Sequence, residues 1–201
     1  MDNVTEEVHN PFGIEVPGGG AYGYGDANAD FHIIGDSPAC HGGAATGVPF
    51  TETAAGRAVQ SVLYELGFAA EPYSDEPELT NAYLSYLHPG FTDGEPSESS
   101  YADQERFLDA ELRAINAHVL LPVGDRPFRY ALAEHTTLAR KLAPDAAAHH
   151  ASPVRGRGFL VVPVADPDAW TVGDRAALVE TLRELLAGDY RQTKGVATTV
   201  G

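Results

Sequence analysis

"FHIIGDSPACHGGAATGVPF" (residues 31–50) is the segment that decides the fold. Its first five residues, FHIIG, form a short apolar run that predicts a buried strand. Asp36, Ser37 and Pro38 follow directly, and a loop rich in Gly, Ala and Thr then leads to Phe50. An acid that follows a buried strand is typical of a site at the carboxyl edge of a sheet. The segment therefore predicts both a strand and a candidate site.

Outward from this segment, strand patterns alternate with helical patterns. Strands are predicted at residues 31–35, 79–84, 118–124 and 158–164, and helices at 53–67, 103–117, a short stretch ending at 132, and 172–188. Four such alternations predict a parallel sheet that helices cover on both faces. We therefore expect a three-layer α/β/α fold with a central, mainly parallel four-stranded sheet.

The whole chain, residues 1–201, is predicted to form a single domain, because its length suits one sizeable core. Residues 1–29 are rich in Gly and Pro and predict an irregular lead-in. Residues 189–201 follow the last predicted helix and are expected to form a tail. We expect a monomer.

The charge of the chain is strongly acidic, with a formal net charge of −16. Lys141 and Lys194 are the only two lysines. Acid-rich, lysine-poor chains are expected where the cytoplasm holds molar salt, since salt at about 1 M screens charges beyond about 3 Å. We interpret the composition as halophilic; the alternative is an ordinary acidic protein with acidic patches. Residues 151–201 are balanced in charge, so an anion-binding surface is expected there, above all at Arg155 and Arg157.

The location expected from composition is the cytoplasm. The acidic N-terminus MDNVTEEVHNPFG has no apolar region of the kind found in signal peptides, and no apolar run is long enough for a membrane span. The single cysteine, Cys40, excludes an internal disulfide framework and any multi-cysteine metal site. No ligand spacing around His9 or His41 suggests a metal either. We expect no metal and no cofactor.

Polar side chains follow several of the predicted strands. Asp36 follows the first strand, Asn81 lies within or just past the second, and Asp166 follows the fourth. The carboxyl ends of parallel strands meet at one edge of a sheet, where ligands bind. The three side chains are therefore expected to converge on one site.

Four motifs resemble the uracil-DNA glycosylase superfamily, over about residues 23–190. Gly35-Asp36-Ser37-Pro38-Ala39 and Gly47-Val48-Pro49-Phe50 are similar to the first motif of family 4, the iron–sulfur enzymes, which reads Gly-Glu-Ala-Pro-Gly and then Gly-x-Pro-Phe. LTNAYLSYLHPG (79–90) resembles the second strand of that family, and ERFLDAELRAINAHVLLPVGD (105–125) its next helix and strand. The resemblance implies hydrolysis of the N-glycosidic bond of a base in DNA.

The resemblance implies a role for three of these side chains. Phe50 would stack on a base flipped out of the DNA helix. Asn81 would read the uracil edge by donating to O4 and accepting from N3–H. Asp36, at the position of the family's Glu, would orient water and stabilise positive charge on the sugar. The ordinary alternatives are a core Phe, a turn-forming Asn and an Asp that caps a turn.

Three features depart from the family pattern, and one of them is Asp36, whose side chain is one methylene shorter than the family's Glu. The family holds its cluster with four cysteines, so a single Cys40 excludes a cluster of that form. The family also ends its fourth strand with His-Pro-Ser, whose His stabilises the departing uracil anion. Two segments could align with that motif: one offers His150 in AHHASPVRGRG (148–158), and the other offers Asp166-Pro167-Asp168, directly after a strand. Catalytic roles are therefore predicted for Asp36 and for either His150 or Asp166, with the second alignment favoured.

The leading hypothesis is a DNA repair glycosylase that removes uracil, or another deaminated base, from DNA by base flipping and base excision. Its partner would be DNA containing uracil, with Arg155 and Arg157 as DNA contacts and no membrane partner. A second hypothesis is a weak or inactive protein of the same fold that binds a nucleobase or nucleic acid. A third, a small-molecule α/β hydrolase, finds no Gly-x-Ser-x-Gly motif in the chain.

Overall fold

A computed structural model of the chain describes residues 8–193. The elements, in chain order, are β1 (Tyr24–Gly25), β2 (Phe31–Gly35), α1 (Pro38–His41), α2 (Ala54–Glu65), β3 (Ala82–Tyr86), α3 (Glu98–Ile115), β4 (Val119–Pro122), α4 (Asp125–His135), β5 (Val154–Arg155), β6 (Leu160–Val161), η2 (Pro167–Ala169), α5 (Val172–Ala187) and η3 (Tyr190–Thr193). No helix among the described residues is long and apolar enough to cross a membrane.

One sheet runs through the molecule in the order β1-β3-β2-β4-β6-β5. The four inner strands are parallel, as the sequence predicts. The sheet has two further strands at its edges, since β1 pairs antiparallel with β3 and β5 pairs antiparallel with β6. Each of these edge strands is only two residues long, and so neither gives a readable alternation in sequence.

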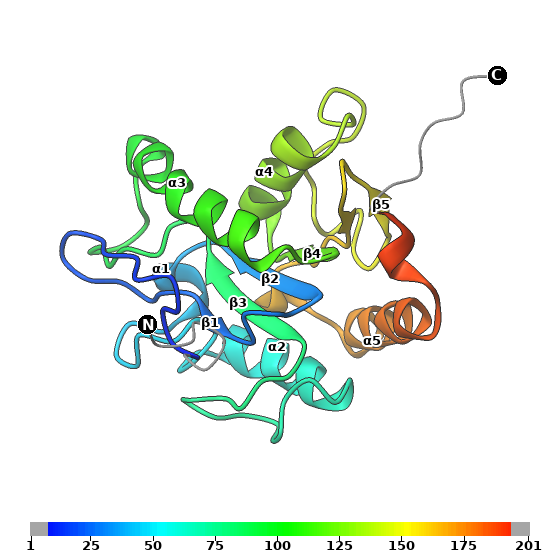
Figure 1. Cartoon of the computed structure of the whole chain (residues 1–201), viewed down its shortest axis with the longest axis horizontal. Coiled ribbons are helices and arrows are strands. Elements are labelled where there is room, and N and C mark those ends of the chain that lie inside the picture. Colours follow the sequence, from blue (N-terminus) through cyan, green and yellow to red (C-terminus); the bar gives the residue numbers. More distant parts are fainter. Residues whose placement is uncertain (1–7, 194–201) are drawn as a thin grey trace.

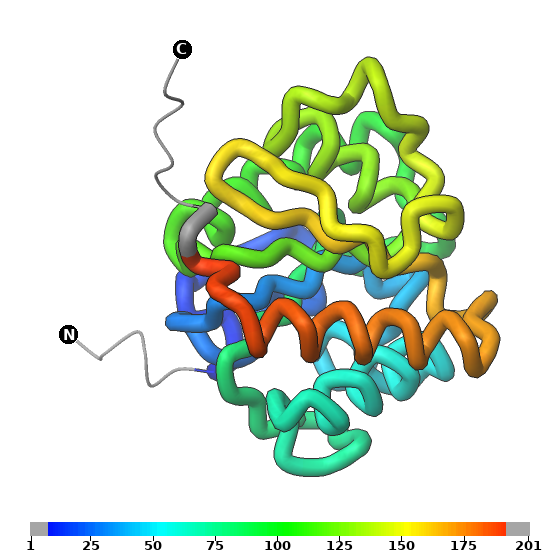
Figure 2. Tube along the Cα trace, turned by 90° about the vertical axis from the view of Figure 1, so that its right-hand side faces the viewer, coloured from blue at the N-terminus to red at the C-terminus, as the bar shows by residue number. Residues whose placement is uncertain are grey.

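Helices cover both faces of the sheet, which confirms the predicted three layers. Figure 1 shows α2 and α5 on one face and α3 and α4 on the other. One core packs Ile33 and Leu121 of the sheet against Val59 of α2 and Leu182 of α5. Figure 2 shows α5 running beside α2 along this face. The opposite core packs Ile34 and Leu120 against residues of α3. Alternate residues of each buried strand therefore serve different layers.

Several predicted boundaries are wrong: the fourth strand, predicted at residues 158–164, is only Leu160–Val161, and two other boundaries concern the site. The second strand begins at Ala82, because its pairing with β2 runs from Phe31↔Ala82 to Gly35↔Tyr86. Asn81 therefore lies just before the strand, with a left-handed φ of 59°. Helix α3 begins at Glu98, five residues earlier than the predicted position, because the Ser97 hydroxyl accepts the Ser100 N–H and caps it.

The lead-in of residues 8–29 is irregular for the most part, yet it packs closely on the sheet. Asn10 N–H donates to Gly23 O, and Ala21 N–H donates to Pro89 O. A side chain at Gly23 would collide with the buried Glu111 and Tyr83. At the other end of the described chain, Tyr190 and Arg191 bind Asp30, so this part of the predicted tail is anchored to the sheet.

Candidate active site

A cleft of about 460 Å³ opens at the carboxyl edge of the sheet. Asp36 follows β2, Gly124 follows β4, and Ala165 and Asp166 follow β6, and all four line it. Its remaining lining residues come mainly from α1, from the start of α4 and from neighbouring loops: Cys40, His41, Glu95, Val123, Asp125, Arg126, Arg129, Asp145, Ala147 and Ala169. Asp36 and Asp166 are therefore brought together, as the strand ends predict.

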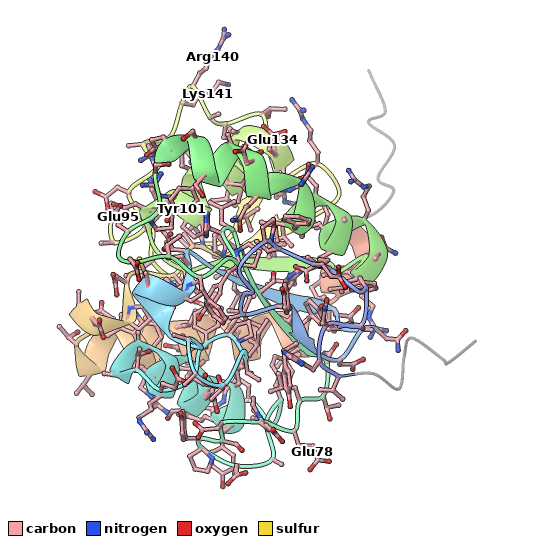
Figure 3. All side chains as sticks on the ribbon, turned by 90° about the vertical axis from the view of Figure 1, so that its left-hand side faces the viewer. Glu78, Glu95, Tyr101, Glu134, Arg140 and Lys141 are labelled. Carbon is pink, nitrogen blue, oxygen red and sulfur yellow. The ribbon has the colours of Figure 1, made fainter. Side chains whose placement is uncertain are left out.

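Asp36 is held from two sides. The Tyr101 hydroxyl donates to Asp36 Oδ1, and Arg126 Nε lies 3.5 Å from Asp36 Oδ2. The guanidinium of Arg126 also lies over the Tyr101 ring, 4.1 Å from its centroid. Burial, and then the bond to Asp36, raise the pKa of the Tyr101 hydroxyl, so it remains a donor at neutral pH. Figure 3 shows Tyr101 below the first turns of α3, on the side of the sheet.

Arg126 is shared among three carboxylates. Besides Asp36, its guanidinium donates to Glu98 Oε1 at 2.6 Å and to Glu95 Oε1 at 3.4 Å. Arg129, one helical turn further along α4, also lines the cleft and is exposed. These two arginines are the basic side chains that line the cleft in the described part of the chain.

The two alternatives for the fourth strand lie in different surroundings. Asp166 lines the cleft, and its carboxylate accepts the Asp168 N–H at 3.0 Å. His150 Nδ1 accepts the Ala165 N–H at 2.9 Å, and its Nε2 donates to Asp174 O at 2.8 Å. Both ring nitrogens are thus used by backbone groups, and the residue does not line the cleft. The predicted alternative in which His150 enters the site is therefore wrong. Its ring instead hydrogen-bonds its own loop to the segment after β6 and to α5.

Phe50 lies in the core and does not line the cleft. Its side chain has no exposed area, and its N–H donates to the Tyr86 hydroxyl at 2.7 Å. The imidazole of His41 stacks on the Phe50 ring, with ring centroids 5.4 Å apart and ring planes at 20° to each other. The expected open stacking face is therefore already covered by a side chain of the same motif.

Three predicted contacts lie at the opposite, amino edge of the sheet. Asn81 precedes β3, where its Oδ1 accepts the Asp30 N–H at 2.8 Å and its own N–H donates to Asp26. Five strand residues, about 16 Å, separate this edge from the cleft. Arg155 pairs with Leu160 at the start of β6, and Arg157 N–H donates to His135 O, so both also lie away from the cleft. The predicted convergence of Asn81 with Asp36 and Asp166 is wrong, because Asn81 precedes its strand. Arg155 and Arg157, predicted as DNA contacts, lie at the end of β5 and in the turn between β5 and β6, at this amino edge.

The sequence analysis missed three residues that line or support the cleft: His41, Tyr101 and Arg126. His41 lies inside the quoted segment, where its position five residues after Asp36 was the available signal. Tyr101 precedes the helix predicted at residues 103–117, so the sequence pattern places it in no helix or strand. Arg126 comes two residues after the third predicted strand, behind Asp125, so its position near a strand end was the available signal.

The described residues contain no group of three or more His, Cys, Asp or Glu side chains that could hold a metal ion. The four-cysteine iron–sulfur cluster of the resembled family does not fit this chain, because Cys40 is its single cysteine and is exposed.

Comparison with known proteins identifies the family. The chain is 29% identical over 168 residues to a Type-5 uracil-DNA glycosylase of Pyrobaculum aerophilum, which covers 81% of this chain and 72% of the relative. This relative is a type 5 enzyme, whereas the sequence motifs of this chain resemble family 4. The two comparisons agree on the uracil-DNA glycosylase superfamily. The model of the uracil DNA glycosylase superfamily matches residues 22–186, which include the cleft and every strand of the sheet. The chain therefore belongs to the uracil-DNA glycosylase superfamily.

Proposed function

We propose that this protein is a DNA glycosylase that hydrolyses the N-glycosidic bond of uracil, or of another deaminated base, in DNA. The observation that supports this most directly is the carboxylate of Asp36 in the cleft, held by Tyr101 and Arg126. A carboxylate fixed in this way can orient a water molecule and stabilise the positive charge that develops on the sugar as the bond breaks. The family match supports the same reaction class.

The charges of the cleft bear on how DNA is held. Phosphate groups bind Arg readily, and the arginines at the cleft are Arg126 and Arg129. We therefore assign the DNA contacts to these two residues in place of Arg155 and Arg157. Glu95 and Glu98 already pair with Arg126, so a phosphate has to compete with them for the guanidinium. In molar salt, contacts inside the cleft then carry more of the affinity than phosphate charge does.

The test is release of free uracil from a labelled oligonucleotide, measured from low to molar KCl with EDTA present. Asp36→Asn is expected to lower the rate by about 10²-fold or more, because it removes the charge opposite the sugar. Asp93→Asn makes the same change in an exposed loop and is the matched control. No release by the wild-type protein in any salt would overturn the proposal.

A second candidate is a protein of this fold that binds a nucleobase or nucleic acid without rapid hydrolysis. It is favoured by Asp166 at the cleft, where a carboxylate opposes the negative charge that grows on a departing base. The same measurement separates the two: binding of the uracil oligonucleotide with no release supports the second.

We also propose that the chain works as a single domain, residues 1–201, and as a monomer in the cytoplasm. The sheet with a core on each face supports the single domain. Light scattering at molar KCl would test the monomer, and a mass of two chains would contradict it.

A further inference from the structure

His41 is a fixed imidazole beside Asp36 that the proposed mechanism has not used. It ends α1, lines the cleft and is only 2% exposed. Its Nδ1 accepts the backbone N–H of Asp36 at 3.1 Å. A ring nitrogen that accepts a hydrogen bond carries no proton, so the neutral ring carries its proton on Nε2.

The free nitrogen of this ring opens to the cleft. His41 Nε2 has no hydrogen-bond partner among the described residues. Among the described residues, the side-chain atoms that are both buried from solvent and without a partner are His32 Nδ1, Ser37 Oγ, His88 Nδ1 and His135 Nε2. His41 Nε2 is not in this set, although it too has no partner among those residues. The atom therefore keeps contact with solvent, and the cleft is the opening that this ring lines. A donor without a protein partner thus faces the space beside Asp36 and Asp166.

The orientation of the ring is set by rigid neighbours. One face stacks on Phe50, and Tyr86 lies against the ring with centroids 6.3 Å apart. The Tyr86 hydroxyl donates to Gly42 O at 2.9 Å, and the Thr53 hydroxyl donates to His41 O at 3.1 Å. The ring is therefore held in place before any ligand arrives, which is the condition for electrostatic stabilisation of a transition state.

The charge state of the ring suits a hydrogen-bond donor. Burial lowers the pKa of His41, although the carboxylates of Asp166, Asp36 and Asp168 act to raise it. The ring is therefore neutral at pH 7. A neutral imidazole offers its N–H without the cost of holding a buried cation.

We propose that His41 is a catalytic residue whose Nε2–H donates to a carbonyl oxygen of the base as it leaves the sugar, an assignment that rests on the proposed glycosylase function. When the glycosidic C–N bond breaks, its electron pair passes to the base, and the negative charge spreads onto the carbonyl oxygen. The N–H bond to that oxygen strengthens as the charge grows. Water adds to the sugar carbon and loses its proton to Asp36. This role is the one that the resembled family gives to a His after its fourth strand.

The test compares two leaving bases. His41→Ala is expected to lower kcat for uracil release by about 10²–10³-fold, the cost of removing one such donor. His41→Gln keeps an N–H donor of similar reach and is expected to recover part of the rate. The loss should be smaller on a substrate carrying 5-fluorouracil, because that anion is more stable and needs less help. His9→Ala, at an exposed histidine, is the matched control.

The outcomes separate this inference from the function on which it rests. Release by His41→Ala at the wild-type rate overturns the inference and leaves the glycosylase function intact. An equal loss on both substrates with no recovery in His41→Gln also overturns it, because a collapsed loop would affect both substrates alike. Thermal unfolding of each variant reports whether the fold survives. No release by the wild-type protein overturns the function and the inference with it.

Discussion

At the scale of single residues, the predictable part of the site is the part that local sequence determines. Asp36 and Asp166 each follow a buried strand, and the cleft brings both together. His150 could not be placed in the same way, because its partners Ala165 and Asp174 lie 15 and 24 residues away in sequence. A histidine near a strand end looks the same in sequence whether backbone groups or a substrate bind its nitrogens.

The charge of Asp166 gives a prediction on rate. Asp166→Asn is expected to raise kcat for uracil release several-fold, because it removes a carboxylate from the space where the base becomes anionic. The amide oxygen can still accept the Asp168 N–H, so the turn before η2 is kept. Asp168→Asn, at the exposed neighbour, should change the rate less. A lower rate in Asp166→Asn would mean that the carboxylate takes part in catalysis.

Glu111 gives a prediction on pH. It is a buried residue of α3, and its carboxylate accepts a hydrogen bond from the Tyr83 hydroxyl at 3.3 Å. Burial raises the pKa of Glu111 to about 8. The folded chain therefore binds a proton that the unfolded chain releases above about pH 4.3. The free energy of unfolding must then fall as pH rises from about 4.3 to about 8, at up to about 1.4 kcal/mol per pH unit.

Glu111→Gln tests this sign, because the amide keeps an acceptor for Tyr83 and cannot ionise. The free energy of unfolding of this variant should be close to that of the wild-type protein at pH 4. Its advantage over the wild-type protein should grow as pH rises to about 8 and stay constant above that pH. Urea unfolding across this range measures the difference. Glu105→Gln, on the same helix, is the control for a carboxylate that is less deeply buried. A constant difference between the two proteins from pH 4 to pH 8 would show that Glu111 is ionised in the fold.

At the scale of elements, helix and strand types were predictable, while their ends depended on distant contacts. Helix α2 has its apolar residues on one face and Thr53 at its start, and both features are local. The start of β3 is set by pairing with β2, which lies about fifty residues earlier, so periodicity alone misplaced Asn81. The displacement of a few residues moved one predicted site residue to the other edge of the sheet.

The cap of α2 links this helix to the site. The Thr53 hydroxyl accepts the Gly56 N–H at 3.0 Å and donates to His41 O. Thr53→Ala is expected to lower the free energy of unfolding by about 1 kcal/mol through the lost cap. It should also lower uracil release, because His41 loses one of the contacts that fix it. Thr53→Ser keeps the hydroxyl and should retain most of both, as thermal unfolding and the release assay would report. Full activity in Thr53→Ala would show that the stack on Phe50 is sufficient to hold His41.

At the scale of the whole molecule, composition predicted a property that the fold does not reveal. The three layers and the parallel inner sheet follow from the order of elements, and the structure confirms them. The halophilic interpretation rests on composition, namely the net charge of −16 and the two lysines, and stays a prediction. The contacts of single residues do not reveal this property. Glu78, for example, projects outward from the surface (Figure 3). Repulsion among many such groups is a property of their sum.

Salt should therefore stabilise this protein by screening. Raising KCl from about 0.1 M to about 1 M shortens the screening length from about 10 Å to about 3 Å, so repulsion among exposed carboxylates largely vanishes. The melting temperature is expected to rise steeply over this range. Replacing Glu71, Glu78 and Glu134 with Gln together removes three exposed carboxylates, and should raise the melting temperature at 0.1 M KCl but not at molar KCl. Thermal unfolding in a KCl series measures both curves.

A change of opposite sign makes the test specific to charge. Arg140 lies at an exposed loop that projects from the molecule (Figure 3), so Arg140→Gln adds to the net negative charge without touching the core. It should lower the melting temperature at 0.1 M KCl and leave it unchanged at molar KCl. If salt acts instead by strengthening apolar burial, all three proteins will keep the same spacing in melting temperature at every concentration. Parallel curves would thus reject charge repulsion as the reason for any salt requirement.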